Sequence, residues 1–570
     1  MTFDIRPNVK CQDLTLCSIL CAVLVLALGL RLWRLGEPVP GFYRDEGVAA
    51  CQGVALARGE RLPESRWNPF NPFPVWGALE AASLSILGPT IFAARLPAAL
   101  AGTAAAAATF AAVVPVTGFW PALLAAGFHA ASFWELVYGR IAVAPVLIFL
   151  QGSLLAIFLL GAPAPNPGRR GLAAGLVAGS ALFGYFAGTH LIAVLAAIGL
   201  LRWRTEPAFR RAARPWALGA MAGFAAIALL AWLNRGAFGY LGQYPFAPPS
   251  RWIPNLLVHL RAMALPFAPA DPRPGYWGLC AFGGPFLSFL EAGAVILGLT
   301  ALAAKGPLRR LAAIGVVWAG IALCPAVLTE SDGPRTNRSI GVPVALGLLA
   351  AAGAAQAGRR WPRALPVLVG GWIAAQAVVG GGRWFGPYRH DPRVAFWADR
   401  TSLDAALWVK GGAARFPVTL VTGDPSYYTM PAVHFLLDRE IRSGRVAVAP
   451  PGPSPRIIAD AIRDSLRGQP EIFVVSLPAM DERPRRAYAL VTGMALVEVA
   501  RGLLRQHRPR EALDYLWPIV TQIPDFGLGH LRLADVYDNL GDVGAARTER
   551  ALAAGWGVTE TPAGIGLILP

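Results

Sequence analysis

Long apolar runs recur through the first two thirds of the chain, and they constrain the fold more than any other feature of the sequence. A helix needs about 20 apolar residues to cross the hydrocarbon of a bilayer, so runs of this length predict membrane spans. We count about eleven such runs. They cover residues 14–36, 92–116, 120–138, 142–161, 171–188, 189–203, 215–234, 284–304, 311–329, 339–357 and 365–382. The fifth and sixth are short and also fit one re-entrant pair.

The composition agrees with a polytopic α-helical membrane protein and excludes a soluble enzyme. Of the 570 residues, 55% are hydrophobic and 15% are charged, whereas soluble proteins have roughly 25% charged residues. The six cysteines include no Cys-x-x-Cys pair, so the sequence indicates neither a zinc site nor a disulfide framework.

Lys and Arg gather in alternate loops between the apolar runs, and this distribution predicts the orientation. Positively charged loops stay in the cytoplasm. The rule places the loops 37–91, 235–283 and 330–338, and everything after residue 383, on the extracytoplasmic side. The residues that define the cytoplasmic side are Arg169, Arg170, Arg202, Arg204, Arg210, Arg211, Arg214, Lys305, Arg309, Arg310, Arg359, Arg360 and Arg363.

The net charge of +17 is therefore interpreted as a topology signal, and no nucleic-acid partner is expected. The first span is longer than a secretory h-region and lacks a clean cleavage site, which predicts an uncleaved anchor. Arg31 and Arg34, at the outer end of this span, are the one local conflict with the pattern. We expect a multi-pass protein of the cell inner or plasma membrane.

A change of composition near residue 383 predicts three domains. Residues 1–382 form the transmembrane domain, and residues 383–490 alternate short strand-like and helical patterns that predict a small extracytoplasmic α/β domain. Residues 491–570 show a 34-residue helical period in which Ala512 and Ala546 share one position, and they resemble about two tetratricopeptide repeats. Such helices bind peptides or partner helices in grooves, so an envelope protein is a candidate partner.

The first extracytoplasmic loop carries an adjacent acidic pair, Asp45 and Glu46, shortly after the first span. Adjacent carboxylates at a membrane surface serve as a general base, an acceptor-orienting group or a metal ligand. A purely structural interpretation is a helix N-terminus whose dipole favours acidic residues. Both interpretations stay open from the residues alone.

The order of features around this pair resembles a known family. After the acidic pair come Arg58-Gly59, the motif Asn68-Pro69-Phe70-Asn71-Pro72, Trp76, Leu87-Gly88 and the stretch from Phe92 to Gly102. This order is similar to the N-terminal half of membrane glycosyltransferases of the GT-C superfold. More narrowly, it resembles the family 39 and aminoarabinose-transferase-like group, which is related to protein O-mannosyltransferases.

The resemblance implies an enzyme that moves a sugar from a polyprenyl-phosphate carrier to a lipid, glycan or protein acceptor on the outer face. In that family the acid of the first loop is the catalytic or acceptor-orienting carboxylate, which corresponds here to Asp45 with Glu46 beside it. The family often has a second acid after the third span. This sequence has Ala144 at the matching place, which departs from a two-carboxylate pattern.

Further candidate substrate-binding residues lie in the other extracytoplasmic segments. Arg44 adjoins the acidic pair, and Arg140 and Arg338 are candidates for binding the donor phosphate, because guanidinium groups match phosphate oxygens. Glu135, at the outer end of the third span, is a further substrate-binding candidate, and it also fits an ion pair with Arg140. Arg338 also fits interfacial snorkelling. Tyr185 and His190 are candidates for the acceptor cavity or, without a substrate, for an aromatic belt and a helix cap.

The predicted mechanism is an inverting transfer in which Asp45 accepts or orients the proton of the acceptor. A phosphate is a good leaving group, so one carboxylate suffices and no cofactor is obligatory, although a divalent cation bridging Asp45, Glu46 and phosphate fits the chemistry. The alternatives are a non-catalytic scaffold or lipid-linked-glycan translocator, and a family member that has lost catalysis.

Overall fold

The computed structural model places most of the chain. It describes residues 12–60, 74–161, 166–183, 185–233, 246–264, 286–329, 336–390, 400–410, 418–421, 431–449, 472–477, 487–492, 503–522, 527–555, 558–561 and 564–567, with single positions at 394, 398, 497, 500 and 501. The predicted motif at 68–72 and much of the loop 235–283 lie outside these residues.

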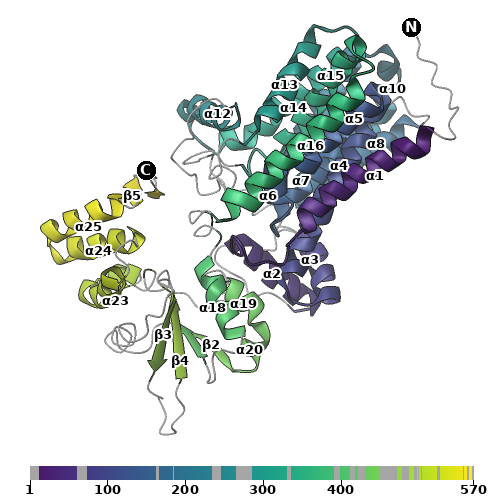
Figure 1. The fold of residues 1–570 in the computed structure, drawn as a ribbon. Coiled ribbons are helices and arrows are strands. Elements are labelled where there is room, and N and C mark those ends of the chain that lie inside the picture. The colour runs from purple at the N-terminus through teal and green to yellow at the C-terminus, as the bar shows by residue number, and fades with distance from the viewer. Residues whose placement is uncertain are drawn as a thin grey trace.

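Most of the described chain before residue 383 forms a bundle of roughly parallel and antiparallel helices (Figure 1). Among the described residues, six helices are long and apolar enough to cross a membrane, which makes this a multi-pass membrane protein. They are α1 (Gln12–Leu32), α4 (Ile91–Thr117), α10 (Pro207–Leu233), α14 (Pro307–Leu328), α15 (Val342–Arg360) and α16 (Leu365–Arg383).

Shorter helices complete the bundle. They are α5 (Phe119–Ala131), α6 (Phe133–Tyr138), α7 (Leu147–Leu160), α8 (Pro167–Ser180), α9 (His190–Thr205) and α13 (Phe289–Thr300). Each of the eleven predicted spans overlaps at least one described helix. The number of spans itself stays a prediction, because several of these helices are shorter than the bilayer requires.

The third predicted span, 120–138, is wrong as a single helix. The chain breaks at Ser132, whose extended backbone (φ −58°, ψ 130°) ends α5 and begins the six-residue α6. The break is stabilised because the last carbonyls of α5 accept hydrogen bonds from a buried arginine of α1, described below. The sequence does not reveal this break, because the residues on both sides of Ser132 are mostly apolar and one serine does not signal a helix end.

Helices α8 and α10 approach each other closely through glycines. A Cβ atom added at Gly175 would lie 2.0 Å from the carbonyl oxygen of Ala220, and one at Gly223 would lie 2.3 Å from that of Leu172. Small residues allow such backbone contact between membrane helices. The pair therefore tolerates no side chain at these positions without separating the helices.

We expect Gly175→Leu to destabilise the bundle by about 3 kcal/mol, since the new side chain overlaps backbone atoms of α10. The measurement is the thermal midpoint of the purified protein in detergent. Gly29→Leu on α1 is the matched control, because no atom lies within 4 Å of a Cβ at Gly29. Equal midpoints for both variants would contradict the close α8–α10 contact.

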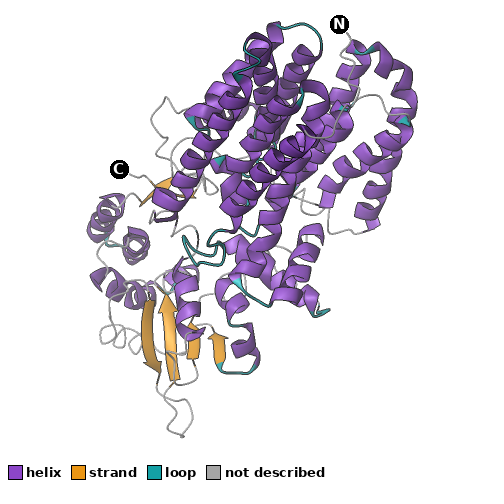
Figure 2. Ribbon diagram, turned by 45° about the vertical axis from the view of Figure 1, so that its right-hand side comes forward, coloured by secondary structure: helices purple, strands orange, loops and turns teal. Residues whose placement is uncertain are grey.

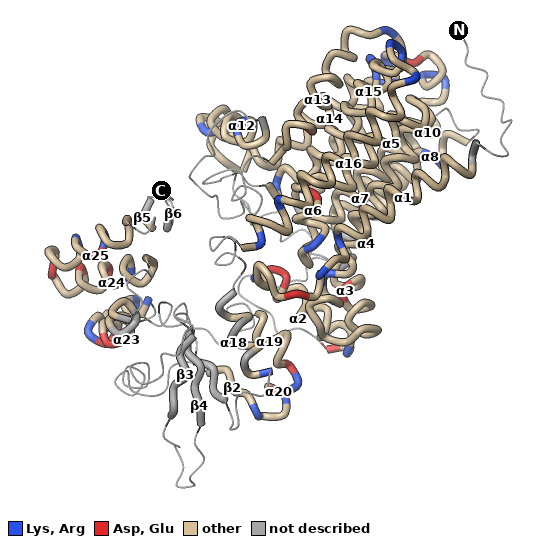
Figure 3. Tube along the Cα trace, viewed as in Figure 1, with Lys and Arg blue, Asp and Glu red and all other residues tan. Residues whose placement is uncertain are grey.

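The predicted cytoplasmic arginines meet at one end of the bundle. Arg170 donates to the carbonyl of Ile157 (2.7 Å), Arg202 donates to that of Leu159, and Arg310 forms an ion pair with Glu206 (3.5 Å). Figure 3 shows this concentration of Lys and Arg at the end of the bundle far from α2 (Arg44–Ala57). These loops therefore gather at one end of the bundle, and their cytoplasmic orientation stays a prediction.

Two helices lie at the opposite end of the bundle, together with part of the chain that follows α16, which we call the post-span segment. Helix α2 packs against α3 (Pro74–Leu87), and α19 (Pro431–Leu436) packs against α2 (Figure 1). The acidic pair and the beginning of the C-terminal part of the chain therefore lie on the same side, opposite the arginine-rich loops.

A four-stranded sheet lies beyond α19 (Figure 2). Its order is β2-β1-β4-β3, with β1 parallel to β2 and β4, and β3 antiparallel to β4. The bounds are β1 (Val418–Val421), β2 (Val446–Ala449), β3 (Ile472–Leu477) and β4 (Ala487–Thr492), with α18 (Arg400–Lys410) and α20 (Asp438–Arg442) among the helices of this part. Strands lie where the sequence predicts an α/β unit.

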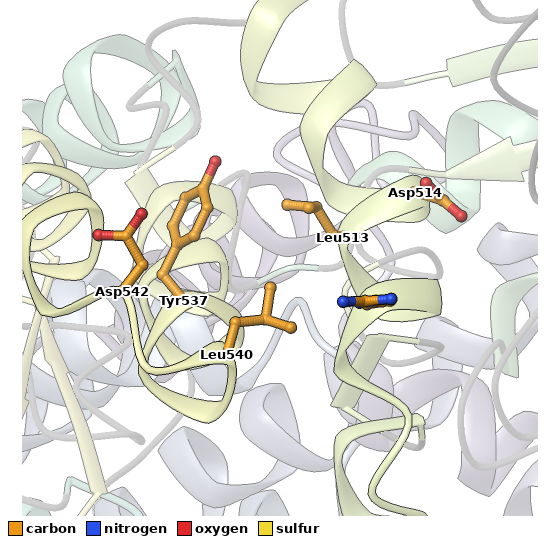
Figure 4. Close-up of a pocket in the computed structure, with 6 residues that line it drawn as sticks. Leu513, Asp514, Tyr537, Leu540 and Asp542 are labelled. Carbon is orange, nitrogen blue, oxygen red and sulfur yellow. The ribbon is translucent and has the colours of Figure 1, made fainter.

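The chain ends in three helices and a two-stranded hairpin. They are α23 (Pro509–Gln522), α24 (Gly527–Leu540), α25 (Val543–Gly555), β5 (Val558–Thr561) and β6 (Gly564–Leu567). Ala512 and Ala546 are fully buried, as the predicted 34-residue period requires. Side chains of α23 and α24, with Asp542, border a hollow (Figure 4). The tetratricopeptide likeness and the exact domain boundaries stay predictions.

Candidate active site

Helix α2 begins directly after Tyr43, and Glu46 fixes this beginning. The backbone N–H of Tyr43 donates to Oε2 of Glu46 (2.8 Å), which satisfies a group that has no partner within the helix. Asp45 and Glu46 both lie in the first turn, where the helix dipole favours negative charge. The structural interpretation of the acidic pair therefore applies to Glu46 directly.

Glu46 is also the centre of a buried ion pair. Nε and Nη2 of Arg95, on α4, donate to the two carboxylate oxygens at 2.8 and 2.9 Å. The N–H of Ala142 donates to Oε1 at 2.8 Å, and Arg95 also donates to the carbonyl of Gly41 at 2.6 Å. Only 1% of Glu46 and 4% of Arg95 is exposed. The carboxylate of Glu46 is thus fully used in joining α2 to the bundle.

Asp45 has a different environment from its neighbour. Its side chain is exposed, and among the residues that the structure describes we find no hydrogen bond or ion pair to it. The protein surrounding the carboxyl reduces its hydration and raises the pKa of Asp45 to about 7, with Arg44 opposing the shift and Glu46 adding to it. Asp45 is therefore accessible to a ligand and titrates near neutral pH.

Arg140 binds backbone carbonyls. Nη1 donates to the carbonyls of Leu30 (2.6 Å) and Arg31 (2.8 Å), and Nη2 donates to that of Trp33 (2.7 Å). The guanidinium also lies over the ring of Trp384, 5.2 Å from its centroid. Arg140 therefore closes the C-terminus of α1, where unpaired carbonyls attract a cation.

Arg31 performs the same role for α5. It is fully buried, and it donates to the carbonyls of His129 (2.8 Å) and Ala130 (3.1 Å). Arg34, the other exception to the orientation rule, forms an ion pair with Glu37. Both outer arginines of the first span thus have protein partners, which explains the local conflict.

The predicted ion pair between Glu135 and Arg140 is wrong. Glu135 is fully buried and its Oε1 lies 2.6 Å from Nδ1 of His129, while Arg140 binds the carbonyls of α1. The sequence separation of five residues suggested the pair, but the break at Ser132 and the turn after Tyr138 direct the two side chains to different partners.

A second polar cluster joins the segment before α15 to the rest of the bundle. Hydroxyl groups of Tyr138 and Thr336 lie 2.6 Å apart, and Asn337 donates to the hydroxyl of Tyr185 at 2.7 Å. Arg338 donates to the hydroxyl of Thr329 at 2.6 Å. Exposed fractions of 4% for Arg338 and 6% for Tyr185 place this cluster inside the protein.

His190 is also buried, and its Nδ1 lies 2.6 Å from the carbonyl oxygen of Ala187. This contact is with a carbonyl of the preceding turn, and the helix-cap interpretation stays a prediction. Thus the structure places seven of the eight predicted residues in two groups. Arg44, Asp45, Glu46 and Arg140 lie around the start of α2 and the end of α1, and Tyr185, His190 and Arg338 lie near the start of α15. Glu135 lies apart from both, buried beside His129.

Sequence reasoning missed the role of Arg95. The residue lies in the stretch from Phe92 to Gly102 that carries the family resemblance, but nothing local pairs it with Glu46, 49 residues earlier. The available signal was its position in an apolar span, because an intramembrane arginine needs a partner.

The described residues include no group of three or more His, Cys, Asp or Glu side chains that could hold a metal ion. Asp45 offers one free carboxylate, while that of Glu46 is occupied by Arg95. Ala144, where a second acid would stand in the family pattern, is buried at 3% exposure.

Comparison with solved structures identifies the fold. ArnT from Cupriavidus metallidurans bound to undecaprenyl phosphate aligns with a TM-score of 0.50 and 15% identity, over 84% of this chain and 98% of ArnT. The chain shares the GT-C fold. No protein-family model and no curated protein matches the sequence.

Two other structures are similar at lower scores. The apo form of the same ArnT aligns with a TM-score of 0.47 and 16% identity, over 78% of this chain and 86% of ArnT. The apo oligosaccharyltransferase of Archaeoglobus fulgidus aligns with a TM-score of 0.40 and 12% identity, over 79% of this chain and 67% of the transferase. The predicted GT-C architecture is confirmed by the first alignment, and the narrower family stays a prediction.

Proposed function

We propose that the protein is an integral-membrane glycosyltransferase that moves a sugar from a polyprenyl-phosphate carrier to an acceptor on the extracytoplasmic face. The observation that carries the proposal is the contrast within the acidic pair. Asp45 is exposed and carries no described hydrogen bond, whereas Glu46 is held by Arg95. An accessible carboxylate at a fixed helix start, at the end of the first span, suits a general base.

The fold supports the donor class. The ArnT structure that shares this fold contains undecaprenyl phosphate, and we extend that carrier class to this protein. The arginine-rich end of the bundle supports an extracytoplasmic position for Asp45, because positive loops stay in the cytoplasm. The C-terminal part, which contacts α2, is then extracytoplasmic too, in a bacterial-type inner or plasma membrane.

The chemistry needs one base. Asp45 accepts the proton of the acceptor hydroxyl or amine while the acceptor atom forms a bond to the anomeric carbon. The bond between that carbon and the phosphate oxygen breaks with its electron pair, so polyprenyl phosphate leaves and the configuration inverts. Phosphate needs little protonation to leave, which agrees with Ala144 in place of a second acid.

Arg44 is our candidate for binding the donor phosphate, because it is exposed in the same helical turn as Asp45. We give Arg140 a structural role in this proposal, since its guanidinium binds three carbonyls of α1 and its end. We also propose that no divalent cation is obligatory, because a lone carboxylate is a weak site for a hard cation that prefers six or more oxygen ligands.

The experiment that tests the function uses membranes that contain the wild-type protein and a panel of radiolabelled polyprenyl-phosphate sugars. We expect one donor to be consumed, with release of polyprenyl phosphate and inversion at the anomeric carbon. Transfer that persists in EDTA would support metal independence. If the protein moves lipid-linked glycans across vesicle membranes without cleaving any donor, the translocator alternative replaces this proposal.

The raised pKa of Asp45 predicts how transfer depends on pH. The base acts as the carboxylate, so kcat/KM should rise with pH and level off above about 7, and it should fall about tenfold per pH unit below that. An aspartate with an ordinary pKa near 3.9 would give a flat profile from about pH 5.5 to 8.5. Initial rates across this range distinguish the two results.

A further inference from the structure

We propose that Ala398 and residues 431–442 hold the helix that carries Asp45 in its catalytic position, and that Pro431, Phe435 and Asp438 are positioning residues for transfer. We call their contacts with residues 41–60 the outer clamp. This inference rests on the proposed function, and it concerns how the site is assembled rather than which residue reacts. It assigns a role to the part of the chain that follows the last span.

Two glycines allow the outer clamp to approach the start of α2. A Cβ atom added at Gly41 would lie 2.3 Å from the carbonyl oxygen of Ala398. A Cβ at Gly47 would lie 2.7 Å from Cβ of Pro431. These contacts flank Asp45 on both sides in the sequence. The backbone that carries the base is therefore in direct contact with the post-span segment.

An apolar contact and hydrogen bonds extend the outer clamp along α2. The rings of Phe42 and Phe435 stack with centroids 5.4 Å apart, and each residue is at most 1% exposed. One helical turn after Gly47, the thiol of Cys51 lies 3.6 Å from the carbonyl oxygen of Pro431. Stacked aromatic rings strengthen a contact beyond the area that they bury.

Charged groups close the far end of the outer clamp. Nη1 of Arg58 donates to Oδ1 of Asp438 at 3.0 Å, and Arg442 donates both to Asp438 (3.0 Å) and to Glu60 (2.6 Å). These hydrogen bonds with both arginines hold the pKa of Asp438 below its ordinary value, although burial opposes the shift. Two acids and two arginines thus join the C-terminus of α2 to α20.

The bundle holds the opposite side of the same helix. Arg95 and the N–H of Ala142 fix Glu46 from the membrane side, while Pro431 contacts Gly47 from the outer side. Asp45 directly precedes both attachments in the first turn of α2. Because a misplacement of about 1 Å can reduce a rate about 100-fold, we infer that loss of the outer clamp lowers kcat even though Asp45 is unchanged.

Charge reversal tests the outer clamp. Arg58→Asp opposes Asp438 with a like charge, and the double variant Arg58→Asp with Asp438→Arg restores an opposite pair. Arg508→Asp is the matched control, since Arg508 forms an exposed pair with Glu511 in the C-terminal helices. All variants carry Cys51 as their only cysteine, in the full-length protein. The readouts are the rate of Cys51 labelling by a water-soluble maleimide, and kcat and KM for transfer.

We expect Arg58→Asp to raise the labelling rate of Cys51 about fivefold and to lower kcat about tenfold with KM for the donor unchanged. The double variant should reverse part of both changes, because Arg442 then faces a like charge at position 438, and Arg508→Asp should change neither value. Unchanged labelling would overturn the outer clamp itself. Faster labelling with wild-type kcat would overturn its positioning role. Absence of transfer by the wild type would instead overturn the proposed function. The labelling rate of Cys51 would still show whether the outer clamp contacts α2.

Discussion

Replacement of Asp45 by Asn should reduce kcat for sugar transfer by about 10²- to 10⁴-fold, the usual contribution of a positioned general base. The amide has nearly the same shape as the carboxyl but cannot accept the proton of the acceptor. Because Asp45 is exposed and has no described hydrogen bond, the fold should be retained. Steady-state rates with the donor consumed by the wild type measure the loss, and the thermal midpoint checks the fold.

Asp514→Asn is the matched control for this variant, since Asp514 is also an exposed acid but lies on α23. It should transfer at the wild-type rate. The acidic limb of the pH profile should also disappear from the residual activity of Asp45→Asn. Full activity of this variant would remove Asp45 from the mechanism. It would direct attention to Glu37, another acid near the end of α1, which pairs with Arg34 and Arg389.

Replacement of Glu46 by Gln should affect folding rather than the chemical step. We expect the free energy of unfolding to fall by about 3–5 kcal/mol. The amide leaves the buried guanidinium of Arg95 without its counter-charge, and an uncompensated charge in the interior is unfavourable. The ion pair is only 1% and 4% exposed, so water does not replace the lost partner. The thermal midpoint in detergent should fall clearly, and activity should fall with the folded fraction.

A double variant separates the charge from the packing at this position. Glu46→Met combined with Arg95→Met removes both charges, and we expect it to recover part of the stability that Glu46→Gln loses. Glu511→Gln, which breaks an exposed pair, should leave the thermal midpoint close to that of the wild type. If Glu46→Gln is as stable as the wild type but inactive, Glu46 takes part in the reaction and its structural assignment is wrong.

The sequence predicted the elements that depend on local pattern. Apolar length located the helices of the bundle, the Lys and Arg distribution grouped the loops at one end, and the order of motifs after Asp45 indicated the GT-C fold. Alternating patterns near residues 418 and 472 located β1 and β3. These features follow from periodicity, length and charge, which a single sequence records directly.

The partners of the charged residues could not be predicted, because they are distant in the sequence. Glu46 and Arg95 are separated by 49 residues, and Arg58 and Asp438 by 380. The sequence therefore suggested Glu135 as the partner of Arg140, which is close along the chain, while the structure gives Arg140 the carbonyls of α1. Residue type indicates that a buried charge needs a partner, but only the fold determines which one.

The reciprocal capping by Arg31 and Arg140 has a consequence for the order in which the protein enters the membrane. The carbonyl of His129 that receives Arg31 is 98 residues further along the chain, and Arg140 lies 109 residues after the carbonyl of Arg31 that it caps. A first span without residues 129–140 thus lacks both the α5 carbonyls that receive Arg31 and the guanidinium that caps α1. Reporter fusions truncated before residue 140 would measure the orientation of this unsatisfied span. Topology should be mapped by insertions into the complete chain.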